Sequence, residues 1–169
     1  PGASERQDPL GKISQFLRVR GVDDLVPVAR AILKLDHGAA GDVLDDHFHD
    51  RGILATIAVG NEGDAKPPHN RVRVPSDCVN ALAVGASDGT GAGWARASYS
   101  CVGPGRAPGI IKPDVVTYGG SDANPFQFLA AGALSADCGT SFAAPNLLRV
   151  AAGMRAHFGR DLSNLAVRT

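Results

Sequence analysis

The chain has 169 residues, a length that builds one domain with a hydrophobic core. Lys and Arg number 17, as do Asp and Glu, so the formal net charge is zero and nothing points to nucleic acid or to an acidic membrane surface. Hydrophobic residues make up 44%, but no apolar run is long enough to cross a bilayer.

The first third of the chain is predicted to be irregular and then helical. Residues 1–22 are polar and form an irregular lead-in. A helix with one apolar face begins at Asp23, and Gly38 is expected to end it. A second helix is expected from Gly41 to about Asp50.

The second helix contains a cluster of acidic and histidine residues, Asp45-Asp46-His47-Phe48-His49-Asp50. These are the side chains of metal sites. However, His47 and His49 are two positions apart and point in different directions on a helix, where facing side chains are three or four apart. The spacing favours a solvated helix face, so no metal or other cofactor is predicted.

A continuous apolar run over 53–59, between two glycines, predicts a strand buried on both faces. It ends at Gly60-Asn61. In open α/β sheets, ligands and reactions collect beyond the carboxyl ends of the strands. The Asn61 amide at such an end can donate a hydrogen bond to a developing negative charge. The alternative is an ordinary turn, because Gly and Asn are common turn residues.

The next segments alternate loops and strands. Strands are expected at 80–86, 96–100 and 114–118, followed by a hairpin over 127–131 and 134–137. Strands interleaved with helices imply an α/β fold of three layers, with a mostly parallel sheet and helices on both faces. His69, in the proline-rich loop 64–73, is predicted to lie at the surface, as are Arg106 and Lys112.

The segment Gly139-Thr140-Ser141-Phe142-Ala143-Ala144-Pro145 leads into an apolar run that predicts a buried helix to about His157. The first N–H groups of a helix have no internal partner, and the helix dipole is positive there. Ser141 is therefore a candidate nucleophile beside a site for negative charge. Pro145 lacks the N–H that would bond the Ser141 carbonyl, so any distortion falls on the first turn. The alternative is a helix that Thr140 or Ser141 merely caps.

The three cysteines, Cys78, Cys101 and Cys138, show no Cys-x-x-Cys spacing and indicate neither a disulfide framework nor a zinc site. Free thiols favour a reducing compartment, and no signal peptide is visible after Pro1, so a cytoplasmic location is expected. Cys138 precedes Ser141 by three residues, and a buried structural thiol is expected there.

Several blocks together carry a family resemblance. The segment 139–145 resembles the serine motif of subtilisin-like serine proteases (subtilases, peptidase family S8), and 58–63 resembles their oxyanion-asparagine motif. Blocks at 74–86, 97–105 and 112–116 follow the family in the same order. The recognisable core spans 52–158 of a partial catalytic domain that occupies 1–169.

The resemblance implies a subtilisin-like fold and a serine endopeptidase that acts on polypeptides without a cofactor. Ser141 is implied as the nucleophile, and Asn61 and the Ser141 N–H as oxyanion donors. Four supporting motif residues are Gly60, Gly139, Thr140 and Pro145. The sequences of 77–80 and 99–106 are similar to those of intracellular bacterial subtilases, some of which are encoded beside an ATPase. This similarity suggests an ATPase as a partner. The family resemblance indicates no substrate-binding residues.

The Asp and His motifs of the subtilase triad are missing from this sequence. His37-Gly38 departs from the His-Gly-Thr-His pattern after two residues and is interpreted as a helix end rather than as the base. His157 lies about 24 Å along the helix from Ser141, too far to serve as its base. These absences predict a domain that is incomplete on its N-terminal side, with an upstream catalytic region, and an isolated chain that is nearly inactive.

Two other functions remain open. One is a pseudoprotease, a scaffold that binds extended peptides without cleaving them. The other is an α/β-hydrolase esterase, but its nucleophile elbow needs Gly-x-Ser-x-Gly and Ala143 stands at the last position. We rank the esterase last.

Overall fold

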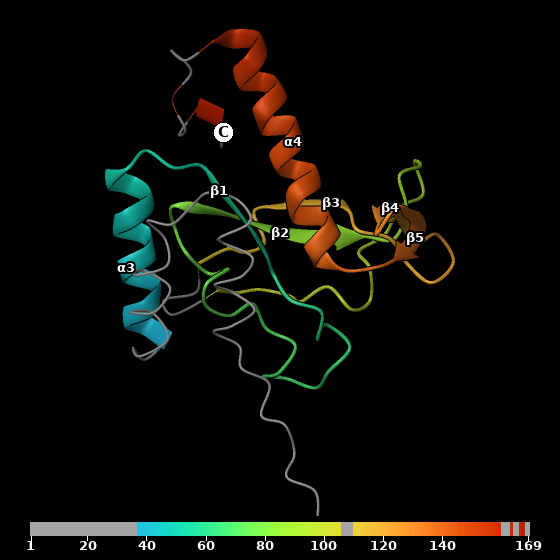
Figure 1. Ribbon diagram of the computed structural model, residues 1–169. Coiled ribbons are helices and arrows are strands. Elements are labelled where there is room, and N and C mark those ends of the chain that lie inside the picture. Colours follow the sequence, from blue (N-terminus) through green and yellow to red (C-terminus); the bar gives the residue numbers. More distant parts are fainter. Residues whose placement is uncertain (1–36, 106–109, 160–162, 164–165, 168–169) are drawn as a thin grey trace, which may run out of the picture.

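The computed structural model describes residues 37–105, 110–159, 163 and 166–167 (Figure 1). The predicted lead-in at 1–22, the helix predicted from Asp23, and Arg106 lie outside the described residues. In chain order the elements are α3 (His37–Asp50), β1 (Ala55–Ala58), β2 (Ala81–Ser87), β3 (Val115–Tyr118), β4 (Phe126–Ala130), β5 (Ala133–Asp137) and α4 (Thr140–Phe158).

The centre of the fold is a parallel sheet with strand order β1-β2-β3. Ala55 of β1 pairs with Ala81, and Val84 of β2 pairs with Val115 of β3. All seven residues of β2 are buried, as expected of a strand with a neighbour on each side. The predicted strands at 53–59, 80–86 and 114–118 are confirmed, with the first shortened to four residues.

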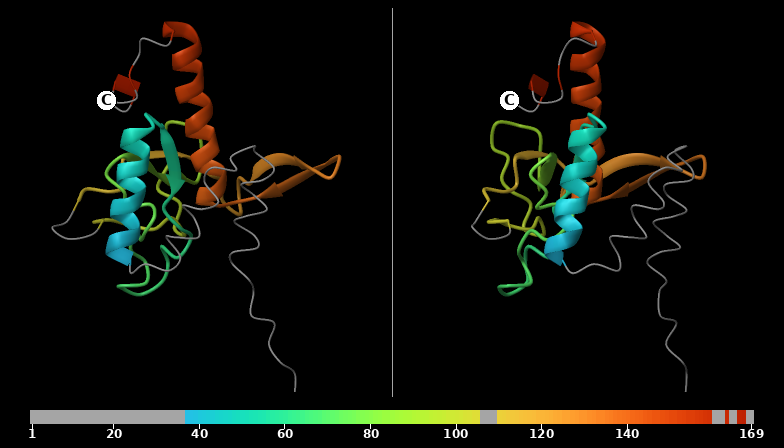
Figure 2. Two further views of the ribbon diagram at one scale, coloured as in Figure 1. Left: turned by 60° about the vertical axis from the view of Figure 1, so that its left-hand side comes forward. Right: turned by 90° about the vertical axis from the view of Figure 1, so that its left-hand side faces the viewer.

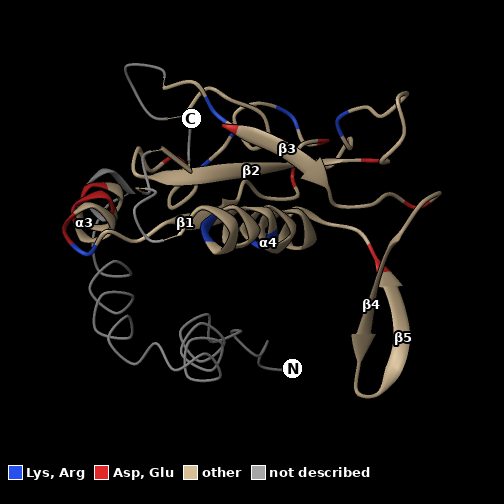
Figure 3. Cartoon of the chain, turned by 90° about the horizontal axis from the view of Figure 1, so that it is seen from above, with Lys and Arg blue, Asp and Glu red and all other residues tan. Residues whose placement is uncertain are grey.

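Helices pack against both faces of this sheet. Side chains alternate along a strand, so Val84 and Ala86 face one side, where Ala143 and Ala144 of α4 meet them. Ala81 faces the other side, beside residues of α3. Figure 3 shows α4 lying along the sheet and α3 beyond one end of β2. The predicted α/β fold with a parallel sheet and helices is therefore confirmed.

Two boundaries differ from the sequence prediction. α3 already begins at His37, so Gly38 lies in its first turn instead of ending an earlier helix. The first N–H groups of a helix lack internal partners anyway, so a glycine there weakens the helix little. β1 is only half-buried, not buried on both faces, because among the described residues it pairs with β2 alone.

The strand predicted at 96–100 is wrong. This segment forms one isolated bridge with β2, between Ser87 and Arg96, and then turns, with the Ser100 hydroxyl accepting from the Ala86 N–H. The Arg96 guanidinium donates to the carbonyls of Ala97, Ser98 and Ser100, which holds the segment as a compact loop. A cation that satisfies three local carbonyls replaces the ladder bonds of a strand.

The predicted hairpin is confirmed as the antiparallel pair β4–β5, which Figure 2 shows extending away from the sheet. It is attached to the start of α4 through aromatic rings. The ring centroids of Phe126 and Phe142 are 5.2 Å apart, and those of Phe128 and Phe142 are 5.0 Å apart. These ring contacts, one stacked and one tilted, hold the hairpin against Phe142, the residue that follows Ser141.

The prediction that α4 is a buried helix holds only for its first half. Leu147 still packs against the core cluster around Val84, and Figure 1 shows the later turns of the helix rising past the strands. Ala151 is buried, but four large apolar residues of this half are exposed: Leu148, Val150, Met154 and Phe158. Within the described residues, no helix is both long and apolar enough to cross a membrane.

An ion pair between the buried Lys112 and the exposed Asp114 lies at the start of β2. Lys112, predicted to be a surface residue, is 5% exposed. Its Nζ lies 2.6 Å from Asp114 Oδ2 and donates to the Ala81 carbonyl at 3.0 Å. Asp114 Oδ2 also accepts from the Ala83 N–H at 2.7 Å. The surface prediction is wrong because a lysine charge can be buried where an acid and a carbonyl satisfy it.

Gly63 offers a first test of the loop packing. A Cβ built there would overlap the Ser100 carbonyl oxygen and lie 2.6 Å from that of Ser98. Gly63→Ala is expected to lower the free energy of unfolding by about 1–3 kcal/mol, because backbone cannot yield without shifting the loop. Urea unfolding measures this, with Gly91→Ala as the matched control, since a Cβ at Gly91 meets nothing within 4 Å. Equal stability of the two variants would contradict this packing.

Candidate active site

Asn61 lies in the turn that follows β1. Gly60 before it has φ +104°, a conformation that favours glycine, and a Cβ there would lie 3.1 Å from Cys101 Sγ. The Gly63 N–H after it donates to the Tyr99 carbonyl at 2.6 Å. The turn is therefore held at both ends by the 96–101 loop, and Asn61 itself is exposed between them.

The side chain of Asn61 is oriented by Thr140, the first residue of α4. Asn61 Oδ1 accepts from the Thr140 backbone N–H at 2.9 Å and from Thr140 Oγ1 at 2.9 Å. Thr140 Oγ1 in turn accepts from the Gly60 N–H at 3.3 Å. With its oxygen occupied twice, the Asn61 amide presents Nδ2 as a donor, and Nδ2 has no partner among the described residues.

Ser141 is the second residue of α4 and is exposed. The N-cap is Gly139, and no side chain caps the helix. The alternative in which Thr140 or Ser141 merely caps the helix is therefore wrong: Thr140 uses its hydroxyl on Asn61 and Gly60. Within the described residues, the Ser141 N–H has no acceptor, as expected in a first turn. The dipole of α4 adds positive potential at this point.

The backbone before Ser141 approaches other elements closely. Gly139 donates its N–H to the Gly119 carbonyl at 2.9 Å. A Cβ on Gly139 would be 3.4 Å from Asn61 Nδ2, and one on Gly119 would be 2.8 Å from the Gly139 oxygen. Glycine at 139 thus brings the asparagine and the helix start together. Pro145 lies inside α4, one turn after Ser141, as predicted.

Tyr99 is a supporting residue that the sequence prediction did not single out. Its hydroxyl donates to the Gly120 carbonyl at 2.7 Å, which ties the 96–101 loop to the segment beside Gly139. Burial raises the pKa of Tyr99 to about 12, and the nearby Cys138 adds to this rise. The hydroxyl therefore keeps its proton and its hydrogen bond across the neutral range. The hydrogen bond joins residues 21 positions apart, so no local sequence pattern predicts it.

The surroundings of Cys101 and Cys138 disfavour the thiolate form of both side chains. Burial raises the pKa of Cys101, which lies under Gly60, and that of Cys138. The carboxylates of Asp122 and Asp137 raise the pKa of Cys138 further. Cys138 is only half-buried, so its prediction as a buried thiol is wrong, because it precedes α4 on an exposed connection.

No described histidine reaches Ser141. His47 and His49 lie in the last turn of α3, and His157 lies in the last turn of α4. His69 is exposed, and its Nδ1 and carbonyl bond to Arg73. His37 begins α3 rather than ending a helix, and its side chain lies outside what is described. The structure thus brings together Asn61, Thr140 and Ser141, with no base beside them among the described side chains.

The acidic cluster of α3 has a structural use. Asp45 is buried, and its two carboxylate oxygens accept from the N–H groups of Val79 and Asn80 at 3.0 and 2.7 Å. These bonds fix the turn that starts β2. Across the described part of the chain, no group of three His, Cys, Asp or Glu residues is arranged to hold a metal ion.

The chain resembles known proteins in both sequence and fold. The model of the subtilase family, Peptidase_S8, matches residues 30–169. Similar solved structures include the self-cleaved protease domain of PatA, with 23% identity and a TM-score of 0.56 over 76% of this chain and 44% of that chain. Sphericase shares 20% identity, with a TM-score of 0.59 over 79% of this chain and 43% of its own. S41 psychrophilic protease shares 28% identity, with a TM-score of 0.57 and the same coverage as sphericase.

The chain thus spans under half the length of these structures. No curated protein matches it.

Proposed function

Because this chain belongs to the subtilase family of serine peptidases, we propose that it is the serine-bearing part of an endopeptidase and that Ser141 attacks the peptide carbonyl. The observation that supports this best is the pair of bonds from Thr140 to Asn61 Oδ1, which leave Nδ2 free as a donor. Asn61 Nδ2 and the Ser141 N–H would hold the oxyanion of the tetrahedral intermediate.

The proton chemistry needs groups beyond those described. Ser141 must lose its proton to a base as it attacks, and that base returns the proton to the leaving amine. None of the four histidines with described side chains contacts Ser141. We propose that the histidine and the aspartate that orients it come from a region upstream of this chain, as the order of the subtilase triad implies.

A pseudoprotease is the second candidate, favoured because no histidine with a described side chain lies beside Ser141. In that function, the site binds an extended peptide and never cleaves it. The two candidates differ in the upstream region: intact Asp and His motifs support the peptidase, and degenerate ones support the scaffold.

A fluorophosphonate serine probe, read by intact mass, tests the proposal. The probe is applied to the 169-residue chain and to the longer polypeptide encoded with its upstream region, each with Ser141→Ala as control. Circular dichroism establishes that every sample is folded. We expect stoichiometric labelling of the longer polypeptide, its loss in Ser141→Ala, and no labelling of the chain alone, because an unassisted serine hydroxyl is a weak nucleophile.

Other outcomes separate the parts of the proposal. Labelling of the chain alone that disappears in Ser141→Ala would support the nucleophile but overturn the upstream base. No labelling of either folded sample would overturn the peptidase and support the scaffold.

Thr140 provides a prediction about positioning. Thr140→Val removes the hydroxyl that donates to Asn61 Oδ1 and accepts from Gly60. In the complete enzyme we expect kcat to fall by about fivefold, since one hydrogen bond contributes about 1 kcal/mol. Thr140→Ser keeps the hydroxyl and should retain most of the activity. Steady-state hydrolysis of a peptide substrate measures kcat of both variants. Equal kcat values for Thr140→Val and Thr140→Ser would contradict the positioning role.

A further inference from the structure

A cavity of about 420 Å³, the Trp94 cavity, lies at the carboxyl ends of β2 and β3. Asp88 directly follows β2, and Tyr118 is the last residue of β3, where it pairs with Ser87. Figure 1 shows β2 pointing toward the β4–β5 hairpin, which is the side of this end. Ligands of open α/β sheets collect beyond such strand ends. The side chains that line the cavity are those of Asp88, Thr90, Trp94, Tyr118 and Asn124.

The loop 88–95, which forms one wall of the Trp94 cavity, is fixed at its base. The Asp88 N–H donates to the Ala95 carbonyl at 3.0 Å, and Asp88 Oδ1 accepts from the Ala95 N–H at 2.8 Å. The Ser121 hydroxyl donates to the Asp88 carbonyl at 3.1 Å and joins the loop to the segment after β3. The carboxylate is thus anchored through Oδ1, and Asp88 Oδ2 has no partner among the described residues.

Two aromatic side chains contribute to the lining. Trp94 is 53% exposed, which leaves part of its ring available to a ligand. Tyr118 is held in place, since its hydroxyl donates to the Asn124 carbonyl at 2.8 Å and its ring centroid lies 5.7 Å from that of Phe126. Tryptophan and tyrosine side chains combine a large ring surface with a polar atom, which suits them to binding sites.

The charge of this lining is negative. Asp88 supplies a carboxylate, and no Lys, Arg or His lines the described part of the cavity. Arg96 is the nearest basic residue along the chain to Trp94, but its Nη1 is committed to the 97–100 loop, where it donates to three carbonyls. A carboxylate beside exposed aromatic rings, without a cation of its own, is suited to a cationic ligand.

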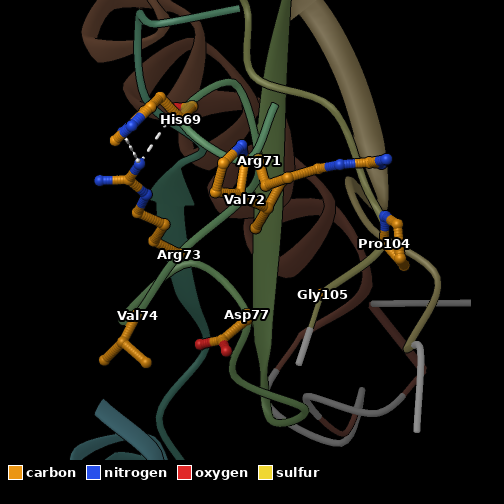
Figure 4. Close-up of a pocket in the computed structure, with 9 residues that line it drawn as sticks. His69, Arg71, Val72, Arg73, Val74, Asp77, Pro104 and Gly105 are labelled. Carbon is orange, nitrogen blue, oxygen red and sulfur yellow. Dashed lines mark hydrogen bonds between the residues drawn. The ribbon is translucent and has the colours of Figure 1, made fainter. Parts of the chain in front are cut away.

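A second cavity, of about 630 Å³, has the opposite balance of charge. Figure 4 shows Arg71 and Arg73 extending to opposite sides of it, where Arg71 donates to the Gly103 carbonyl and Arg73 to the His69 carbonyl. Two arginines face one acid, Asp77, in this lining. A cation is therefore expected at the Trp94 cavity and not at this one.

We propose that the Trp94 cavity binds the guanidinium group of an arginine side chain. The Asp88 carboxylate would form charge-assisted hydrogen bonds with the planar guanidinium, and the Trp94 and Tyr118 rings would attract it through their π-systems. Asn61 follows β1 and Asp88 follows the neighbouring strand β2, at a strand spacing of about 5 Å, so one extended polypeptide could reach both. That the arginine belongs to a substrate polypeptide rests on the proposed function, whereas guanidinium binding does not.

The fluorescence of Trp94 tests the proposal on the full folded chain, because this chain has a single tryptophan. Nα-acetyl-arginine amide is titrated at constant ionic strength. Nα-acetyl-citrulline amide is the matched ligand control, since a neutral urea group replaces its guanidinium. We expect a saturable change in Trp94 emission with the arginine ligand and binding of the citrulline ligand that is weaker by roughly tenfold or more.

Asp88→Asn should weaken binding of the arginine ligand by roughly tenfold or more, because it removes the charge and keeps an acceptor for the Ala95 N–H. Asp46→Asn is the matched control variant, since it neutralises an exposed carboxylate on α3. Circular dichroism checks that each variant is folded. The citrulline comparison uses the wild-type chain, so it decides the question even if Asp88→Asn does not fold.

The proposal is overturned if the arginine ligand gives no saturable change, if the citrulline ligand binds equally well, or if Asp46→Asn weakens binding as much as Asp88→Asn. Fluorophosphonate labelling of Ser141 is a separate readout. A chain that binds the arginine ligand while its longer form remains unlabelled supports the cavity and overturns the peptidase. Labelling of Ser141 without arginine binding does the reverse.

Discussion

Asn61→Ala is expected to lower kcat of the complete enzyme by about 10²- to 10³-fold, with a much smaller change in KM. The size of this effect is the one known for the asparagine oxyanion donor of subtilisin itself. The physical reason is that Nδ2 strengthens its bond only when negative charge develops on the carbonyl oxygen, so its loss affects the transition state more than substrate binding. Steady-state kinetics on a peptide substrate measure both constants.

Alanine at 61 also removes the acceptor of the buried Thr140 N–H, so part of its effect is structural. Asn61→Asp separates the two contributions. An aspartate keeps the acceptor for Thr140, and its charge suits the N-terminus of α4, so we expect stability to be kept. It replaces the Nδ2 donor with an anionic oxygen that repels the oxyanion. A stable Asn61→Asp variant that retained activity would contradict the donor role.

Lys112→Met is expected to lower the free energy of unfolding by about 1.5–3 kcal/mol. The methionine keeps the apolar stem but removes the charge that pairs with Asp114 Oδ2 at 2.6 Å. Asp114 stays accessible to water, with 25% of its side chain exposed, so the loss is that of hydrogen bonds to a charged group rather than that of a fully buried pair. It also leaves the Ala81 carbonyl without the Nζ donor, at the start of the buried strand β2. Thermal and urea unfolding measure the loss.

Two comparisons make the Lys112 prediction specific. Lys66→Met changes an exposed lysine and should alter stability by less than about 0.5 kcal/mol. Lys112→Met/Asp114→Asn removes both charges and should recover part of the loss, since the Asp114 carboxylate is then not left without its cation. Equal stability of Lys112→Met and the wild-type chain would show that the pair contributes nothing to the sheet.

The sequence predicted the elements that carry their own local signal. The apolar run before Gly60, the strand of β2 and the hairpin over 127–137 were all placed to within a few residues, because hydrophobic runs and turn residues determine them. The family resemblance, carried by short motifs at 58–63 and 139–145, is confirmed by the family match over 30–169.

The failures come from contacts between distant residues. Arg96 satisfies three carbonyls and turns an apparent strand into a loop, and Asp114 allows Lys112 to be buried. The orientation of Asn61 depends on Thr140, and no local pattern predicts that a threonine at a helix start will bond a side chain 79 positions earlier. Periodicity describes neighbours along the chain, whereas these interactions depend on tertiary packing.

The bonds between Asn61 and Thr140 also bear on when the site forms during folding. They join residues 79 positions apart, so they form only after a long loop has closed and after β1, β2 and α4 have docked. A collapsed intermediate with its helices and strands formed but not yet packed would lack an oriented amide at Asn61. The Asn61 amide and the start of α4 are therefore aligned only once the native packing is complete.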